Sequence, residues 1–246
     1  MTTHTALITG GTGGLGTAFA QALHDAGNVV LVTHLPSEDP TEWLATQKAA
    51  GYTFKAYPVD VSDYESTQAL AAQIKADGYH VDILINNAGI TRDASFKKMS
   101  KEAWDAVIGV NLDSMFNMTK PFIDAMAAQN WGRIVNIASI SGIRGNFGQA
   151  NYAATKAGIT GFTKTLALEY ARKGVTVNSI SPGFIRTAMT AAIPKEVMEN
   201  VLLPQIPVGR LGEPEELAAL IAFICSEKAG FLTGANINMN GGQYML

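Results

Sequence analysis

A tyrosine and a lysine stand four residues apart in the second half of the chain, where an acid and a cation could act together. Tyr152 and Lys156 belong to the stretch Tyr-Ala-Ala-Thr-Lys at the start of a helical run, so they share one helix face with Cβ atoms roughly 5–6 Å apart. A phenol ordinarily titrates near about 10, and a neighbouring ammonium group favours the phenolate and lowers the pKa. Such a phenol could protonate a ketone oxygen while hydride arrives at the carbon. The same spacing is also common on ordinary amphipathic helix faces.

Two further polar residues could serve the same chemistry. Ser139 follows the apolar run 133–138, and its hydroxyl could bind the carbonyl oxygen that Tyr152 protonates. Asn111 interrupts a helical stretch that begins near Lys101, although asparagine competes with backbone groups and is a poor residue for a helix interior. Its residue type alone is equally consistent with a surface asparagine that packing tolerates.

A glycine-rich loop near the start of the chain predicts a binding site for a dinucleotide. Thr9-Gly10-Gly11-Thr12-Gly13-Gly14-Leu15-Gly16 follows a short apolar run and opens a helical pattern, which is the context of the dinucleotide fingerprint. Glycine lets backbone N–H groups approach a pyrophosphate at the positive end of a helix. Because glycine also serves strand-to-helix turns for geometry alone, the loop gains its weight from its place in a βαβ unit.

A second loop, Asn86-Asn87-Ala88-Gly89, comes directly after the predicted strand 81–85. Open α/β sheets bind ligands at the carboxyl ends of their parallel strands. The asparagine amides could therefore hold a nucleotide. An Asx turn that merely ends the strand is an equally good interpretation of these four residues taken alone.

Short apolar runs alternate with helical patterns along nearly the whole chain, and this alternation must bring the polar residues together. Several runs are almost continuous Val, Ile and Leu, as in strands that are covered on both faces. We therefore predict an α/β fold of the Rossmann type, a doubly wound parallel sheet of about seven strands with helices on both faces. The predicted strands are residues 6–9, 29–33, 54–59, 81–85, 133–138, 175–180 and 235–239.

Three local signals complete the predicted layout. Ser62-x-x-Glu65 matches a capping box at a helix start, and Pro121 is expected to kink or end the helix that begins near Lys101. Residues 184–207 are rich in Ala and Met and hold three prolines. We interpret them as a mobile substrate lid within one domain that covers residues 1–246.

Composition and charge exclude several classes of protein. Hydrophobic residues make up 47% of the 246 residues and charged residues 16%, which supports a large core and excludes a disordered chain. A net charge of −3 leaves no cationic face for sequence-independent binding of nucleic acid. The single cysteine, Cys225, excludes an internal disulfide framework and a cysteine-cluster metal site, and we expect no metal.

The amino-terminal residues bear on location. The first apolar run begins too early for a signal peptide, and no run approaches the roughly 20 residues that span a bilayer. A soluble, cytoplasmic protein without a membrane partner is expected.

In this order, the motifs resemble those of the short-chain dehydrogenase/reductase family over essentially the whole chain, which ends in Asn240-Gly241-Gly242. The resemblance implies an NAD(P)-dependent oxidoreductase with Tyr152 as general acid/base and Ser139 orienting the carbonyl. It further implies that Lys156 holds the nicotinamide ribose and that Asn111 positions a water of the proton relay. Besides Tyr152 and Lys156, the implied cofactor site comprises Gly10, Thr12, Gly13, Gly14, Leu15, Gly16, Asp60, Val61, Asn87, Ala88, Gly89, Pro182, Gly183, Ile185 and Thr187.

The family is usually a homotetramer, and two parts of this chain could pair with copies of themselves. The stretch 236–246 and the helix that begins near Pro214 are apolar enough for such contacts, for which closed two-fold symmetry is the default. A non-catalytic dinucleotide sensor on the same fold is also conceivable, because fold does not fix function. Such a sensor would have no need for Ser139, Tyr152 and Lys156 together.

Within the family, the chain most resembles the acetoacetyl-CoA reductases of polyhydroxybutyrate synthesis, through residues 42–44 with 47–48, 87–93, 131–136 and 147–149. This likeness implies a short 3-ketoacyl-CoA, a small molecule, as substrate, and a pocket that Phe147, Gln149 and Phe184 line beside Ser139. The subgroup often carries tyrosine where this chain has Phe184, which puts one polar contact in doubt. Plain core packing of Phe147 is a competing interpretation. Candidate partners for the CoA phosphates are Arg92, Lys97, Lys98, Arg186 and Lys195.

The 3-oxoacyl-carrier-protein reductases share almost every motif and are the alternative. Carrier protein is acidic, and those enzymes tend to carry basic residues just before the fifth strand. Residues 125–131 contain none, which favours the CoA thioester.

The loop after the second predicted strand favours NADH. The 2′-phosphate of NADPH needs a nearby guanidinium or ammonium group. Residues 10–16 hold no basic residue, and residues 33–47 hold none apart from His34. Glu38 and Asp39 stand where the acetoacetyl-CoA reductases commonly carry arginine, so they would repel the phosphate. We expect NADH to be used at least as well as NADPH, the subgroup's usual cofactor, although no acid stands at the very end of that strand.

Overall fold

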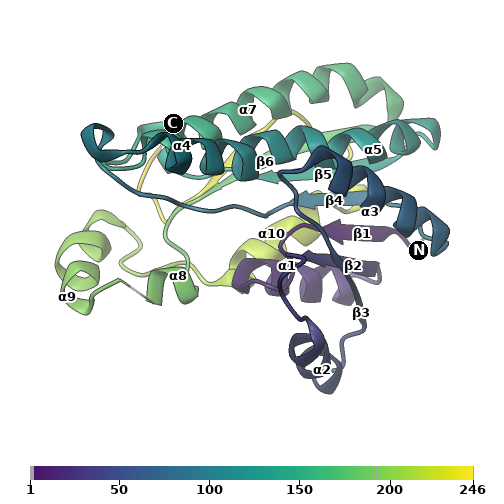
Figure 1. Ribbon diagram of the computed structural model, residues 1–246, viewed down its shortest axis with the longest axis horizontal. Coiled ribbons are helices and arrows are strands. Elements are labelled where there is room, and N and C mark those ends of the chain that lie inside the picture. The colour runs from purple at the N-terminus through teal and green to yellow at the C-terminus, as the bar shows by residue number, and fades with distance from the viewer. Residues whose placement is uncertain (1–2, 192, 246) are drawn as a thin grey trace.

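In the computed structural model, which describes residues 3–191 and 193–245, a seven-stranded sheet forms the centre of the protein (Figure 1). All neighbouring strands pair in parallel, in the spatial order β3-β2-β1-β4-β5-β6-β7. The predicted Rossmann-type fold is confirmed, and the predicted strand boundaries differ from those observed by at most two residues. The strands are β1 (Thr5–Ile8), β2 (Val29–His34), β3 (Phe54–Pro58), β4 (Ile83–Asn86), β5 (Gly132–Ile137), β6 (Val175–Pro182) and β7 (Asn236–Met239).

Helices cover both faces of the sheet (Figure 1). One face carries α1 (Gly14–Asp25) and α10 (Pro214–Ile224), and the other carries α3 (Tyr64–Ala76), α5 (Ser114–Ala128) and α7 (Ala150–Tyr170). Successive residues of a strand point to opposite faces. Leu7 therefore packs in the core beneath α3 and α5, whereas Ile8 packs in the core beneath α1 and α10. Burial on both faces explains why the strands are continuous apolar runs. The short α2 (Thr41–Ala49) follows β2.

The predicted capping box at Ser62 is wrong. Asp63 is the N-cap of α3, and its Oδ1 accepts a hydrogen bond from the Glu65 amide over 2.9 Å. The Ser62 hydroxyl instead donates to Asp60 Oδ1 over 2.6 Å. A carboxylate is a charge-assisted acceptor for the free N–H groups of a helix start, so Asp63 caps in preference to the hydroxyl one residue earlier.

The chain stays helical from Lys101 to Ala128, but its winding changes around Asn111. Helix α4 (Lys101–Ile108) passes into the π-helical turn Gly109–Asp113 and then into α5. Pro121 lies inside α5 and does not end it. The Asn111 side chain is 0% exposed, so its interpretation as a surface asparagine is wrong. A π-turn inside an α-helix is frequent at functional sites.

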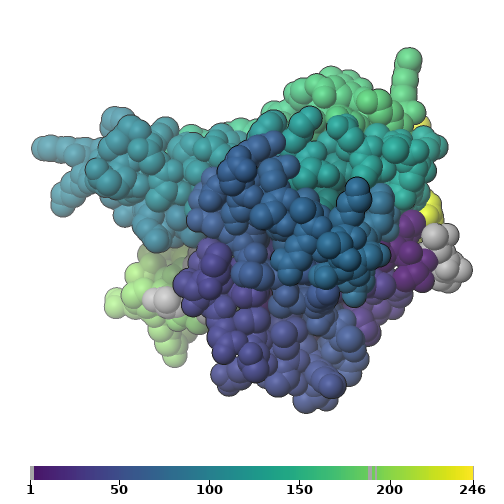
Figure 2. Space-filling view, turned by 45° about the vertical axis from the view of Figure 1, so that its right-hand side comes forward, coloured from purple at the N-terminus to yellow at the C-terminus, as the bar shows by residue number. Residues whose placement is uncertain are grey.

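Residues 184–207 form a series of short helical turns, which stand away from the layered body in Figure 1. They are α8 (Ala188–Ala191), α9 (Lys195–Val197), a π-turn (Met198–Leu202) and a 3-10 turn (Leu203–Gln205). In Figure 2 this green segment lies below a blue-green projection from the middle of the chain. Buried Ile185 and Ile206 anchor its two ends. That it moves as a lid stays a prediction. No helix in the described part of the chain is long and apolar enough to span a membrane.

Candidate active site

Ser139, Tyr152 and Lys156 meet at the carboxyl end of β5. Ser139 follows that strand, and the other two residues lie in the first turns of α7. Ser139 is close enough to Tyr152 to oppose the rise of the phenol pKa, and Lys156 Nζ lies 5.5 Å from the centre of the Tyr152 ring. Close approach depends on Gly142, since a Cβ there would lie 2.6 Å from the Lys156 carbonyl carbon. The structure therefore brings the three predicted catalytic residues together.

Burial sets the protonation of this cluster. Lys156 is buried and donates from Nζ to the Ile137 carbonyl over 2.6 Å, and burial lowers its pKa to about 8. Burial raises the pKa of Tyr152 and outweighs the opposing hydrogen bond from Ser139. The net lowering of the phenol pKa predicted from Lys156 is thus not found, because burial has the larger effect. A raised pKa keeps the phenol protonated at neutral pH, which is the form that donates to a ketone oxygen.

Asn111 ties the π-turn to the loop that follows β4. Its Oδ1 accepts from the Ile90 amide over 2.8 Å, and its Nδ2 donates to the Ile90 carbonyl over 2.9 Å. A Cβ on Gly89 would lie 3.3 Å from Asn111 Oδ1 and 3.6 Å from Lys156 Nζ. Both polar groups therefore border the same point of this loop. The water-positioning role of Asn111 stays a prediction.

Asn87 and Ala88 are joined to the glycine loop and not to their own turn. The Asn87 side chain donates to the carbonyls of Thr9 and Gly10 over 2.9 and 3.2 Å. The Thr9 hydroxyl oxygen in turn accepts from the amides of Asn87 and Ala88, each over 2.9 Å. The interpretation of this stretch as a local Asx turn is therefore wrong. These bonds hold two of the predicted cofactor-binding loops in register, and Thr9, the first residue of the glycine-rich motif, joins them through its hydroxyl and carbonyl groups.

The glycine loop fits a pyrophosphate group. A Cβ on Gly16 would lie 2.3 Å from the Gly10 carbonyl oxygen, and one on Gly11 would lie 2.5 Å from Val32, so these two glycines permit the tight turn. Gly13 and Gly14 are exposed, and among the described residues no side chain caps the first turn of α1. The free N–H groups there, at the positive end of a 12-residue helix, can bind an anion.

The other predicted cofactor residues lie along the same carboxyl edge of the sheet. Thr187 approaches the glycine loop, with its Cβ 3.7 Å from where a Cβ on Gly14 would be. Gly183 packs so closely on Asn240 that a Cβ would lie 2.8 Å from its Cα. Val61 is buried after β3, and its carbonyl accepts from Asn117. Leu15 lies in the first turn of α1, and the rest follow or end strands β1, β3 and β6, namely Thr12, Asp60, Pro182 and Ile185.

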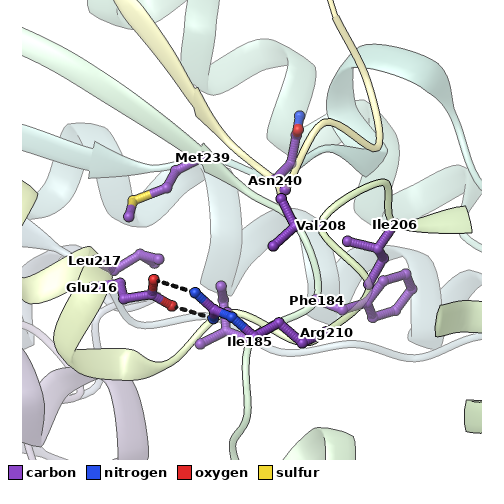
Figure 3. Close-up of a pocket in the computed structure, with 11 residues that line it drawn as sticks. Phe184, Ile185, Ile206, Val208, Arg210, Glu216, Leu217, Met239 and Asn240 are labelled. Carbon is purple, nitrogen blue, oxygen red and sulfur yellow. Dashed lines mark hydrogen bonds and ion pairs between the residues drawn. The ribbon is translucent and has the colours of Figure 1, made fainter.

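The predicted substrate residues have separate surroundings. Phe147 is 91% exposed, so its interpretation as core packing is wrong. Phe184 borders a cavity of about 220 Å³ with Ile206, Val208 and Met239, and the Arg210–Glu216 ion pair, 2.7 Å long, lies in its wall (Figure 3). As far as the described residues show it, the lining of this cavity does not include Ser139 or Tyr152.

The basic side chains predicted to bind the CoA phosphates differ in their contacts. Arg186 is paired with Glu213 over 3.0 Å, and Lys195 with Glu199 over 3.7 Å. Arg92 is exposed on the loop after β4, and Lys97 and Lys98 are exposed on the 3-10 turn Phe96–Lys98 that follows it.

Comparison with known proteins decides the family. A family model described as "Enoyl-(Acyl carrier protein) reductase" matches residues 10–243. The chain belongs to the short-chain dehydrogenase/reductase family. As a short-chain dehydrogenase/reductase it is a nicotinamide-dependent oxidoreductase.

Its relatives cover the chain almost completely. Acetoacetyl-CoA reductase of Cupriavidus necator is 50% identical over 246 residues, which is 100% of both chains. Nodulation protein G of Azospirillum brasilense is 50% identical over 238 residues, which is 96% of each chain. The 3-oxoacyl-[acyl-carrier-protein] reductase of Aquifex aeolicus is 45% identical over 242 residues, or 97% of this chain and 96% of the relative.

Proposed function

We propose that this chain is an acetoacetyl-CoA reductase, which reduces the 3-keto group of a short 3-ketoacyl-CoA to the 3-hydroxy group. The convergence of Ser139, Tyr152 and Lys156 beside the glycine loop carries the proposal, because together they can bind and protonate a carbonyl oxygen next to a dinucleotide. Likeness over at least 97% of the chain to enzymes named acetoacetyl-CoA reductase supports the choice of substrate.

In the proposed reaction, the bound nicotinamide supplies the hydride, and the residues of this chain manage the oxygen. The Ser139 hydroxyl donates a hydrogen bond to the ketone oxygen, and the protonated Tyr152 transfers its proton as negative charge develops there. Hydride on carbon and this proton on oxygen complete the alcohol. The Lys156 ammonium, which persists below about pH 8, then offsets the phenolate charge.

Steady-state turnover of acetoacetyl-CoA with reduced cofactor tests the proposal. Turnover should be abolished or severely reduced in Tyr152→Phe, which lacks the transferable proton. Absence of turnover in the wild type, or unchanged turnover in Tyr152→Phe, would refute it. The alternative substrate, an acetoacetyl carrier protein, is favoured by the carrier-protein reductase among the relatives. A kcat/KM at least roughly tenfold higher for the carrier-protein substrate would establish that alternative.

We further infer that NADH is used at least as well as NADPH. The acidic loop is exposed directly after β2, and Asp39 Oδ1 accepts from the amide and hydroxyl of Thr41 over 2.9 and 2.6 Å. These bonds hold the Asp39 pKa below its usual value, so the carboxylate is charged at neutral pH. A second negative charge, Glu38, stands beside it. Such a loop repels a 2′-phosphate and can accept hydrogen bonds from ribose hydroxyls.

Binding titrations followed by protein fluorescence test the cofactor preference without turnover. Asp39→Asn removes the charge and keeps an oxygen for Thr41, so it should tighten NADPH binding roughly threefold, the scale of an exposed charge interaction. Glu42→Gln, on the exposed surface of α2, is the matched control and should leave both affinities unchanged. A wild type that binds NADPH more than about tenfold tighter than NADH would overturn the inference.

A homotetramer is proposed as the working assembly. Large apolar side chains are exposed on the two regions predicted to pair between copies, namely Phe223 on α10 and Met245 near the end of the chain, and Phe231 between these regions is exposed as well. Leu168 on α7 is exposed as well. Solvent-facing apolar groups of this size favour contacts between subunits.

A further inference from the structure

The amide of Gln149 is occupied by partners within the protein. Its Oε1 accepts from the Ser141 hydroxyl and from Asn146 Nδ2, each over 3.0 Å, and its Nε2 donates to Asp93 Oδ2 over 2.9 Å. The side chain therefore joins the loop that holds Asp93 to the stretch from Ser141 to Gln149. The carbonyl end of the amide faces two donors and the nitrogen end faces a carboxylate, so the amide has one satisfied orientation.

Ser141 connects this amide to the proposed catalytic centre. It is buried at the start of α6 (Ser141–Arg144), and its backbone amide donates to Ser139 Oγ over 3.1 Å. Because Ser139 Oγ accepts this hydrogen bond, its own hydroxyl hydrogen points in another direction and is free to be donated to the ketone oxygen. The placement of Ser139 thus depends on Ser141, whose side chain is held by Gln149.

Asp93 is the solvent-exposed end of the series of hydrogen bonds that runs from Ser139 through Ser141 and Gln149. It is exposed on the loop after β4, and its carboxylate can only accept, so it meets the nitrogen end of the amide and not the oxygen end. A charged acceptor makes this the strongest bond of the Gln149 amide. The neighbouring backbone supports the same junction, because the Ala94 amide donates to the Gly148 carbonyl over 2.9 Å.

We propose that Asp93 is a positioning residue, which orients the Gln149 amide and through it holds Ser141 and the Ser139 hydroxyl in place for reduction. The role rests on the proposed function of Ser139. It also revises the part predicted for Gln149, whose carbonyl oxygen is engaged by Ser141 and Asn146 and whose main task is to join the loops around the substrate.

Four variants test the proposal by kinetics with acetoacetyl-CoA. Asp93→Ala and Ser141→Ala should each lower kcat roughly tenfold, the scale of one lost hydrogen bond to a charged or positioning group. The double variant should be no worse than the poorer single variant, because both act through one chain of bonds. Asp93→Asn keeps an acceptor for Nε2 and should restore kcat to within about threefold of the wild type.

Further readouts separate positioning from a purely structural role. The KM for the cofactor and the unfolding temperature should stay unchanged in all four variants. The alkaline fall in reductase activity near pH 8 follows Lys156, so it should keep its position in Asp93→Ala while kcat falls. Asp105→Asn, an exposed carboxylate on α4, is the matched control and should change neither kcat nor the pH profile.

Wild-type kcat in Asp93→Ala, or losses that multiply in the double variant, would overturn the proposal. Crystal structures of Asp93→Ala and Ser141→Ala provide a test that does not need turnover. The Gln149 amide or the Ser139 hydroxyl should leave its wild-type position, and unchanged positions would contradict the role of Asp93. A wild type inactive on acetoacetyl-CoA would refute the proposed function alone, since these structures would still decide the positioning role.

Discussion

Alanine substitutions at two glycines of the first loop, Gly13 and Gly16, should have different effects although each adds only one methyl group. One should weaken cofactor binding and the other should lower the stability of the fold. At Gly16 the new Cβ would lie 2.3 Å from the Gly10 carbonyl oxygen and 2.7 Å from Gly11 Cα. Gly13 is exposed, with a φ of −77°, and its Cβ would meet the same carbonyl oxygen at 3.4 Å, an ordinary contact. Gly16→Ala should therefore destabilise the protein, and Gly13→Ala should leave it folded and block the approach of a pyrophosphate.

The magnitudes follow from these contacts. Relief at Gly16 requires a backbone shift of about 1 Å, and overpacking against backbone costs about 3 kcal/mol. Alanine regains about 1 kcal/mol of helix propensity, which leaves a net loss of about 2 kcal/mol, or roughly 4–8 °C in Tm. Alanine in place of glycine at the N-cap costs only about 0.5 kcal/mol. Loss of a close backbone contact to the anion should weaken cofactor binding by roughly tenfold.

Urea unfolding and calorimetric titration with NADH measure the two effects separately. Gly161→Ala is the matched control, because its Cβ would meet no described atom within 4 Å on α7. It should raise stability by up to about 1 kcal/mol and leave the affinity unchanged. The reasoning fails if Gly13→Ala loses as much stability as Gly16→Ala, or if Gly13→Ala binds NADH as tightly as the wild type.

Three other outcomes are expected. The kcat for reduction should fall as pH rises through about 8, because burial lowers the Lys156 pKa to that value and the ammonium is lost above it; a pH profile that stays flat to about pH 10 would contradict this. Arg133→Met should lower the free energy of unfolding by about 3 kcal/mol in urea titrations, since the buried guanidinium binds the carbonyls of Gly132 and Ser226. Its kcat should be unchanged, because Arg133 lies at the other end of β5 from Ser139. Phe231→Glu should reduce the assembly mass in light scattering, and an unchanged tetramer mass would exclude Phe231 from the subunit contact.

The fold and the glycine loop could be predicted because their signals are local. Each strand is buried on both faces, so its apolar run is visible without knowledge of its neighbours. The tight turn at Gly16 and the helical spacing of Tyr152 and Lys156 likewise depend on backbone geometry over a few residues. The order of these motifs was then enough to indicate a reductase of this family.

The errors arose where neighbouring residues compete for one role. Ser62 and Asp63 both have the chemistry of an N-cap, and the helix start selects the carboxylate. Lys156 is near enough to influence Tyr152, yet its ammonium binds Ile137, and burial dominates the phenol pKa. Asn111 was placed in the interior by a π-turn that residue types do not signal.

The amino-acid sequence by itself determined which elements form and which residues carry the chemistry. Tertiary structure alone decided how those residues are held. The hydrogen bond that Gln149 donates to Asp93 joins residues 56 positions apart, and the one that Asn87 donates to the Thr9 carbonyl joins residues 78 positions apart. Hydrogen-bond partners are selected by distance and direction in space, which depend on the packing of the whole sheet and its helices. No local pattern contains that information.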